Sequence, residues 1–150
     1  MDNFPQFIGS LYNGVDSLLT NAPKPNTSSV VKGPPRKGTE EHKKNSAETE
    51  RLSYKYPDRI PVIVITCDDL VIDKTKFLVP NSLTFGQLMY TIRKRLDMTD
   101  PRQLGSQEAL YGLVDRCMVP TSQLIAQNYQ KSKHTDGMLY VYVYRENTFG

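Results

Sequence analysis

Residues 61–96, PVIVITCDDLVIDKTKFLVPNSLTFGQLMYTIRKRL, decide the fold, because two strand patterns are followed at once by a helix pattern. The first strand is Pro61–Cys67, a run of β-branched residues that is typical of a strand buried on both faces. The second strand is the short apolar segment Lys76–Val79. Residues 84–87 (Thr-Phe-Gly-Gln) then form a capping box, which predicts the start of a helix.

This helix has one apolar face and one basic face. Its apolar side chains are expected to point inward: Phe85, Leu88, Met89, Ile92 and Leu96. Its basic side chains are expected to face solvent: Arg93, Lys94 and Arg95.

The remainder of the chain adds a third strand at Ala109–Val114, a short helix at Ser122–Tyr129 and a last strand at Met138–Tyr144. The predicted order is therefore two strands, a helix, a strand, a short helix and a strand. That is the order of elements in an α+β, ubiquitin-like β-grasp fold.

The N-terminal third differs in composition from this body. Hydrophobic residues make up 38% of the whole chain but are scarce between Asn21 and Asn45. We expect an amphipathic segment at residues 1–20, a disordered basic linker at residues 21–44 and the ubiquitin-like domain at residues 45–150. The domain should begin with a helical extension, capped at Asn45 or Ser46 and ended by Tyr56 and Pro57.

The amphipathic segment follows helical spacing, but Gly9 and Gly14 each cost such a helix about 1 kcal/mol. It therefore needs a surface on which to dock. The body of the protein, a membrane interface and a partner protein are all open candidates.

Charge and cysteine content limit the classes of function. The net charge of +3 and the pI of about 8.8 are too small to indicate nucleic-acid binding. Cys67 and Cys117 form no CxxC motif, and no long apolar span is present, so a cytoplasmic setting is expected, with any membrane attachment peripheral or covalent. His42 and His134 lack metal-ligand spacing, and Cys117 has no evident base, so we expect neither an enzyme nor a cofactor.

The segment after the last strand reads Arg-Glu-Asn-Thr-Phe-Gly, residues 145–150. Glycine has no Cβ and permits close backbone approach, which adenylation and thioester transfer of a chain terminus require. The carboxylate of Gly150 is therefore a candidate reactive group, whether Gly150 is the natural terminus or the result of trimming.

Several stretches resemble the autophagy ubiquitin-like modifiers, the family of light chain 3 and the GABA-receptor-associated protein. The matching stretches are KYPDRIPVIV (55–64), DKTKFLVP (73–80), LTFGQLMYTIRKRL (83–96), MVPTS (118–122) and the segment from Asp136 to the final ENTFG. Together they cover nearly all of residues 46–150.

The resemblance implies a reaction for the tail. In this family an E1-like enzyme activates the C-terminal glycine, E2-like thioesters pass it on, and an amide bond joins it to phosphatidylethanolamine. Gly150 would then be the conjugated residue and Phe149 the residue recognised beside it. A cysteine protease that exposes and later releases the glycine is a further implied partner, and the lipidated form would sit on the autophagosome membrane.

The resemblance also implies a groove in which an aromatic-x-x-aliphatic motif of a partner protein adds to the edge strand Lys76–Val79. The first pocket would be lined by Glu48, Leu52, Pro61, Ile63, Lys76, Leu78 and Met138. The second would be lined by Phe77, Val79, Pro80, Leu83, Leu88 and Thr91. Lys74, Lys76 and Arg95 would set selectivity for acidic motifs.

The chain also departs from the family pattern. Thr91 and Met138 replace larger apolar residues, the connection between Leu96 and Ala109 is longer than usual, and residues 1–39 are additional. Two other functions stay open: a modifier that is conjugated to protein lysines, and an unconjugated cytoskeletal adaptor that binds tubulin.

Within the additional residues, 12–15 (Tyr-Asn-Gly-Val) fit the docking pattern themselves. We hypothesise that this segment folds back into the protein's own groove. Insertion of the same apolar face in a membrane is the competing hypothesis.

Overall fold

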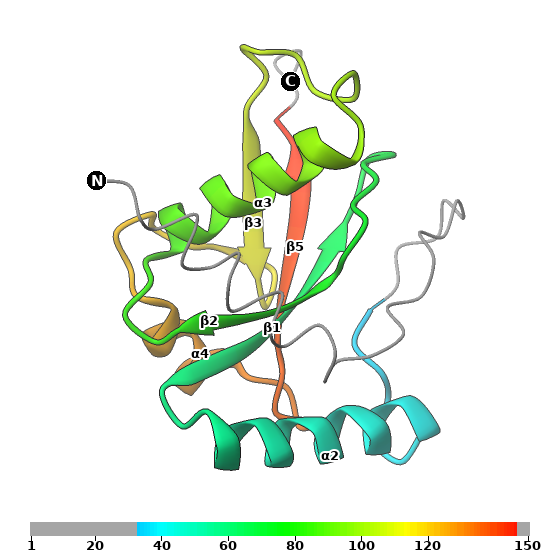
Figure 1. The fold of residues 1–150 in the computed structure, drawn as a ribbon, viewed down its shortest axis with the longest axis vertical. Coiled ribbons are helices and arrows are strands. Elements are labelled where there is room, and N and C mark those ends of the chain that lie inside the picture. Colours follow the sequence, from blue (N-terminus) through cyan, green and yellow to red (C-terminus); the bar gives the residue numbers. More distant parts are fainter. Residues whose placement is uncertain (1–32, 147–150) are drawn as a thin grey trace.

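The computed structural model describes residues 33–146, which are built around one five-stranded sheet (Figure 1). Its strands are β1 (Arg59–Thr66), β2 (Lys76–Pro80), β3 (Leu110–Val114), β4 (Cys117–Met118) and β5 (Leu139–Arg145). They lie in the order β2-β1-β5-β3-β4. β1 and β5 are parallel, and the other neighbouring pairs are antiparallel. The predicted amphipathic segment and the tail residues Phe149 and Gly150 lie outside the described residues.

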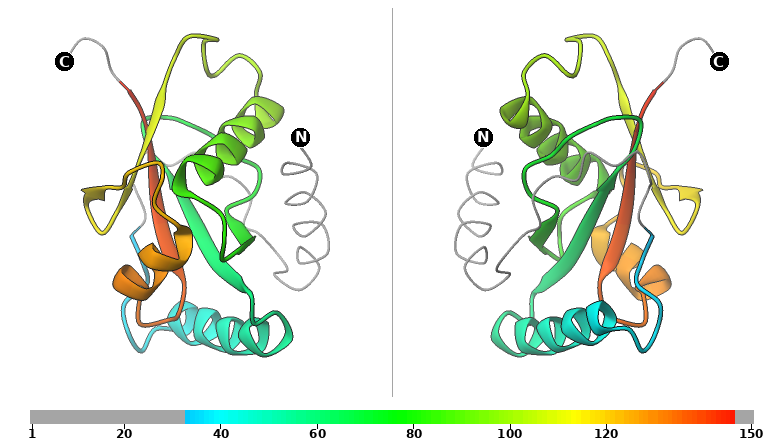
Figure 2. Two further views of the ribbon diagram at one scale, coloured as in Figure 1. Left: turned by 90° about the vertical axis from the view of Figure 1, so that its left-hand side faces the viewer. Right: turned by 90° about the vertical axis from the view of Figure 1, so that its right-hand side faces the viewer.

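Three helices complete the described part: α2 (Glu40–Lys55), α3 (Phe85–Thr99) and α4 (Ile125–Ser132). Figure 2 shows α3 and α4 on one side of the sheet, while α2 lies across one end of it. Alternate side chains of β1, β2 and β5 form a buried core with the apolar face of α3. The predicted α+β, ubiquitin-like β-grasp architecture is confirmed.

α3 forms as its sequence predicts. The Thr84 hydroxyl accepts a hydrogen bond from the Gln87 amide (3.2 Å), and the Gln87 side chain accepts one from the Thr84 amide (3.0 Å). The inward residues Phe85, Leu88, Ile92 and Leu96 are buried, and Met89 packs against them. The helix thus presents one continuous apolar surface to the sheet.

β1 corrects one prediction, since it is not buried on both faces. Val62 and Val64 are buried in the core, whereas Ile63 and Ile65 on the other face are only half-buried. Pro61, on the same face of β1 as Ile63, is buried. The reason is that α2 covers only one end of this second face, so the rest of the strand remains partly open (Figure 1).

α2 corrects a second prediction, since it begins at Glu40 and not at Asn45 or Ser46. Its N-cap is Thr39, whose hydroxyl accepts a hydrogen bond from the His42 amide (3.2 Å). Residues 40–44, which we placed in the linker, are helical. The helix ends at Lys55 with Tyr56 as its C-cap, as predicted.

Two elements after α3 also differ from the prediction. The two-residue strand β4 was missed, because a strand this short gives no alternating pattern. α4 begins at Ile125 and not at Ser122, with Leu124 at its N-cap. Leu124 has no side-chain acceptor, and the Gln127 side chain instead accepts a hydrogen bond from the Leu124 amide (3.2 Å).

A buried polar group ties α2 to the start of β5. The Asn45 amide donates to Asp136 Oδ2 (3.3 Å) and to the Tyr140 hydroxyl (3.2 Å), and that hydroxyl donates to Asp136 Oδ2 (2.6 Å). Burial, and then the adjacent Asp136 carboxylate, raise the pKa of Tyr140 well above its usual value. α2 is therefore docked by specific hydrogen bonds as well as by apolar contacts.

Candidate docking face and conjugation tail

β2 forms an edge of the sheet. Only β1 pairs with it among the described strands, so one row of its backbone N–H and C=O groups is left without a strand partner. An edge of this kind can accept an extended peptide as a further strand. The register sets Pro61 opposite Leu78 and Ile63 opposite Lys76 on the strand pair next to that edge.

The residues predicted to line the first pocket come together where α2 meets the sheet. Leu52 of α2 and Leu78 of β2 are buried against each other, and Tyr56 packs on both. Met138, also buried, comes directly before β5, whose first residue Leu139 pairs with Val62. The set comprises Glu48, Leu52, Pro61, Ile63, Lys76, Leu78 and Met138.

The charges in this set are already paired. Lys76 Nζ lies 2.9 Å from Glu48 Oε1, and the two side chains are 16% and 8% exposed. Arg51 approaches the other oxygen of Glu48 at 3.9 Å. A partner's acidic group would therefore have to share Lys76 with Glu48.

The residues predicted for the second pocket belong mainly to the core. Phe77 and Val79 point to the side of β2 opposite Leu78, where they pack with Leu83 and Leu88 beneath α3. Pro80 is buried as well. Core packing therefore accounts for the apolar character of Phe77, Val79, Leu83 and Leu88.

Thr91, the remaining residue of the second set, is half-buried, and its hydroxyl donates to the carbonyl of Gln87 (3.0 Å). This bond satisfies the hydroxyl within α3.

Lys74 and Arg95, predicted to set selectivity, lie near the start of β2, where Asp73 and Lys74 come just before Lys76. Arg95 donates two hydrogen bonds to the Asp73 carboxylate, at 2.8 and 2.9 Å. Burial, and then the charge of Arg95, lower the pKa of Lys74. The structure thus brings these two cations close to each other, while Lys76 pairs with Glu48.

The tail leaves from the opposite end of the sheet to α2 (Figure 1). β5 ends at Arg145, and the Glu146 amide still donates to the Ala109 carbonyl (2.9 Å). The Arg145 side chain forms ion pairs with Glu108 and Asp69. Sequence reasoning missed this contact, because 37 and 76 residues separate the partners.

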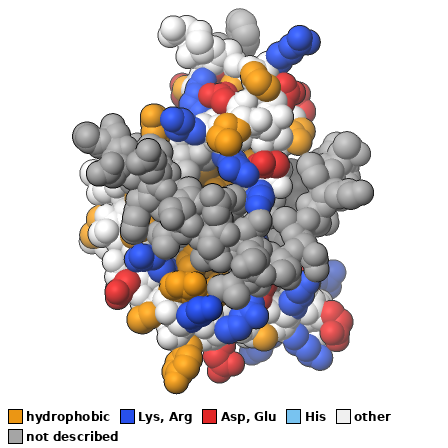
Figure 3. Space-filling model, viewed as in Figure 1, with side chains coloured by type: hydrophobic (Ala, Val, Ile, Leu, Met, Phe, Trp, Pro, Cys, Tyr) orange, Lys and Arg blue, Asp and Glu red, His pale blue; other side chains and the backbone are white. Residues whose placement is uncertain are grey.

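The described surface carries a mixture of charges, and Cys117 is a free, exposed thiol on it. Figure 3 shows Lys and Arg side chains alternating with Asp and Glu at the lower end of the molecule, where α2 lies. Residues 33–146 contain no cluster of three or more His, Cys, Asp or Glu side chains that could hold a metal ion. None of the helices described is long and apolar enough to cross a bilayer.

Comparison with known proteins agrees with this architecture. The family model described as "Autophagy protein Atg8 ubiquitin like" matches residues 44–150. Autophagy-related protein 8 of Schizosaccharomyces pombe is 43% identical over 110 residues, which cover 71% of this chain and 86% of that protein. Autophagy-related protein 8e of Arabidopsis thaliana is 44% identical over 110 residues, covering 71% and 85% of the two chains.

A solved structure supports the same relationship. The crystal structure of Trypanosoma brucei ATG8 superposes with a TM-score of 0.64 at 31% sequence identity, covering 79% of this chain and all of that one. The family match includes the elements that form the sheet, the docking edge and the tail. The chain belongs to the Atg8 family of ubiquitin-like autophagy proteins.

Proposed function

We propose that this protein is a modifier whose Gly150 is joined to phosphatidylethanolamine during autophagosome formation. In this role it is the substrate of E1-like and E2-like enzymes and not itself an enzyme. It moves from the cytoplasm to the autophagosome membrane when lipidated. A cysteine protease that processes and releases the tail is its other enzymatic partner.

The observation that carries this proposal is the construction of β5. This strand pairs with β1 over residues 139–143 and with β3 over residues 142–145, so a neighbouring strand holds it up to the point where residues 146–150 begin. A rigid central strand therefore supports a short segment, ENTFG, that lies inside the family match. Such a segment can enter a narrow active site while the body remains outside it.

The chemistry needs no group from the body of this chain. The Gly150 carboxylate attacks the α-phosphate of ATP and pyrophosphate leaves, and an E1 cysteine thiolate then displaces AMP. After transfer to an E2 cysteine, the amine of phosphatidylethanolamine displaces the thiolate and loses a proton to form the amide. Two acyl chains then hold the protein at the membrane, which a single chain would do only marginally.

Reconstitution tests the proposal. The full chain is incubated with E1-like and E2-like enzymes, ATP and liposomes that contain phosphatidylethanolamine, and the liposomes are floated on a density gradient. The wild type should float, whereas Gly150→Ala, and the wild type with phosphatidylcholine liposomes, should stay at the bottom. Equal flotation of the wild type and Gly150→Ala would contradict the proposal.

We further propose that β2 receives aromatic-x-x-aliphatic motifs of cargo and receptor proteins. The unpaired edge of β2 and the apolar residues around Leu52 and Leu78 support this role. Ile63 and Ile65 provide a matched pair of variants, because both are half-buried on the same face of β1 and only Ile63 pairs with β2.

Calorimetric titration with a motif peptide should show about tenfold weaker binding for Ile63→Ala and less than a twofold change for Ile65→Ala. Tenfold corresponds to about 1.4 kcal/mol, a value reasonable for a truncated apolar anchor. Equal losses of peptide affinity in the two variants would contradict the assignment of Ile63 to the first pocket.

A further inference from the structure

Arg145 occupies the point at which the sheet ends and the tail begins. It is the last residue of β5 and pairs with Leu110 of β3. Since five residues lead from Arg145 to Gly150, the two Cα atoms lie at most about 18 Å apart. The direction in which the chain leaves Arg145 therefore controls the space that the Gly150 carboxylate can reach.

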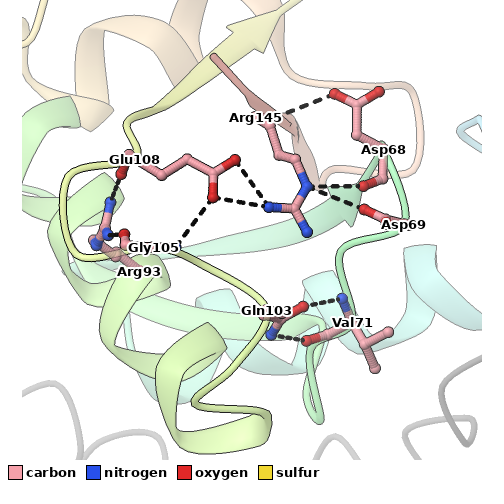
Figure 4. Close-up of polar contacts among 8 residues, drawn as sticks. All are labelled: Asp68, Asp69, Val71, Arg93, Gln103, Gly105, Glu108 and Arg145. Carbon is pink, nitrogen blue, oxygen red and sulfur yellow. Dashed lines mark hydrogen bonds and ion pairs between the residues drawn. The ribbon is translucent and has the colours of Figure 1, made fainter. Parts of the chain in front are cut away.

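The guanidinium group of Arg145 joins two separate loops to β5 (Figure 4). Nη1 donates to both carboxylate oxygens of Glu108, at 3.0 and 2.9 Å. Nε donates to Asp69 Oδ1 (3.0 Å) and to the Asp68 carbonyl (3.3 Å). In addition, the Arg145 backbone amide donates to Asp68 Oδ2 (3.3 Å).

Glu108 is held in place before it meets Arg145. Its carboxylate accepts a hydrogen bond from the Gly105 amide (3.1 Å), and Arg93 of α3 donates to the carbonyls of Gly105 and Glu108. The Gly105 amide, and then Arg145, hold the pKa of the Glu108 carboxyl below its usual value. The longer connection after α3 is thus anchored and presents a fixed anion to the end of β5.

The other loop is fixed in an unusual conformation. Asp68 and Asp69 both have positive φ, 56° and 60°, a region that non-glycine residues seldom adopt. Gln103 also holds this loop, since its side chain accepts from the Val71 amide and donates to the Val71 carbonyl, both at 2.8 Å (Figure 4). Strained backbone of this kind persists where the surroundings determine it, often at a functional position.

We propose that Arg145 is a positioning residue for conjugation, which fixes the exit of residues 146–150 by clamping the end of β5 between the 68–69 loop and the 105–108 loop. This inference rests on the proposed function of Gly150. The Arg145 and Glu108 side chains are 23% and 30% exposed, so the two-pronged contact is partly shielded from water. Asp69, at 80% exposure, contributes less.

Lysine should replace arginine only in part. Its single ammonium group can pair with Glu108 but cannot at the same time extend a planar second N–H to Asp69. A matched control is Arg102→Ala, which also removes one positive charge, in this case from the 100–109 connection. Arg102 is exposed, and its guanidinium has no ion pair among residues 33–146.

The first measurement is independent of any enzyme. Backbone ¹⁵N relaxation of the full chain should show a lower order parameter at Glu146 in Arg145→Ala than in the wild type, with Arg145→Lys between them and Arg102→Ala unchanged. The melting temperature of all four proteins is recorded beside it. An unchanged order parameter at Glu146 in Arg145→Ala would overturn the clamp.

The second measurement is the rate of E1 thioester formation against modifier concentration. Because the body binds the enzyme and the clamp only aims the tail, Arg145→Ala should lower kcat about fivefold or more and change KM less than twofold. If the wild type forms the E1 thioester and Arg145→Ala has the same kcat, the positioning role of Arg145 is overturned but the proposed function of Gly150 is not. If neither the wild type nor any variant forms the E1 thioester, the proposed function of Gly150 fails, and the role of Arg145 in conjugation fails with it.

Discussion

Gly137, in the turn before β5, lies where a side chain would not fit. Its φ is +87°, and a Cβ placed on it would lie 2.4 Å from Cγ2 of Thr49 on α2. The close approach of helix and turn at this point brings Asn45 within hydrogen-bonding distance of Asp136. A glycine here therefore serves the docking of α2.

Gly137→Ala and Gly38→Ala separate the two effects of an added methyl group. Gly38 also has positive φ, +92°, but nothing lies within 4 Å of its added Cβ. We expect Gly38→Ala to lower the free energy of unfolding by about 1–2 kcal/mol from backbone strain. Gly137→Ala should lower it by about 1–3 kcal/mol more, from overpacking against Thr49. Urea denaturation measures both, and equal losses would show that the contact with Thr49 relaxes freely.

Single residues also show which parts of the site could be predicted from the sequence and which could not. Gly150 and Phe149 could be singled out because they belong to a recognisable segment of family type. Arg145 could not, since the charges that surround it come from loops distant along the chain and no spacing rule connects them. The predicted outward direction of Arg95 likewise gave no sign of its two bonds to Asp73.

At the scale of elements, the sequence predicted those with a strong local pattern. α3 has a capping box and a regular apolar face, and β5 has a long continuous apolar run. α2 has few apolar residues, so its start at Glu40 could not be predicted from an apolar pattern, and the N-cap Thr39 was the main local signal. The half-exposed face of β1 followed from where α2 docks, which is a property of tertiary structure.

The docking of α2 leads to a prediction at high pH. The pKa of Tyr140 is raised in the folded protein by burial, and then by Asp136, above the value of about 10 that an unfolded tyrosine has. The folded state therefore binds this proton more tightly, and the stability it provides is complete below pH 10 and falls as pH rises above 10. Tyr140→Phe should remove that part of the alkaline loss.

The measurement is the free energy of unfolding of both proteins from pH 7 to pH 11. At pH 7, Tyr140→Phe should be less stable by about 1–3 kcal/mol, because Asp136 loses a buried donor. The gap should narrow above pH 10. Tyr129, Tyr142 and Tyr144 also have raised pKa values and serve as a common background in the two proteins. A constant gap would mean that Tyr140 does not ionise differently in the two states.

At the scale of the whole molecule, the sheet separates the two proposed sites. The apolar residues around Leu52 and Leu78 lie at the end covered by α2, and the tail leaves from the other end. Seven residues of β5 connect Met138 to Arg145, a distance of roughly 23 Å along a strand. On the proposed function, a docking partner and a conjugation enzyme would therefore bind without overlap at their centres.

The N-terminal residues supply a prediction at this scale. We hypothesise that residues 12–15 compete with motif peptides for the groove. Removing residues 1–32 leaves Thr39 and α2 intact, and should strengthen peptide binding severalfold in a calorimetric titration. The double substitution Tyr12→Ala and Val15→Ala in the full chain should do the same. Unchanged affinity in both variants would favour a membrane or a partner as the surface for this segment.

The central claim is that Gly150 becomes joined to phosphatidylethanolamine. Tandem mass spectrometry of the C-terminal peptide from autophagic cells, expressing either the wild type or Gly150→Ala, tests it most directly. We predict that the wild-type peptide carries phosphatidylethanolamine in amide linkage to Gly150 and that the Gly150→Ala peptide carries no adduct. A wild-type peptide attached instead to a lysine side chain of another protein, or found only with a free carboxylate, would contradict the claim.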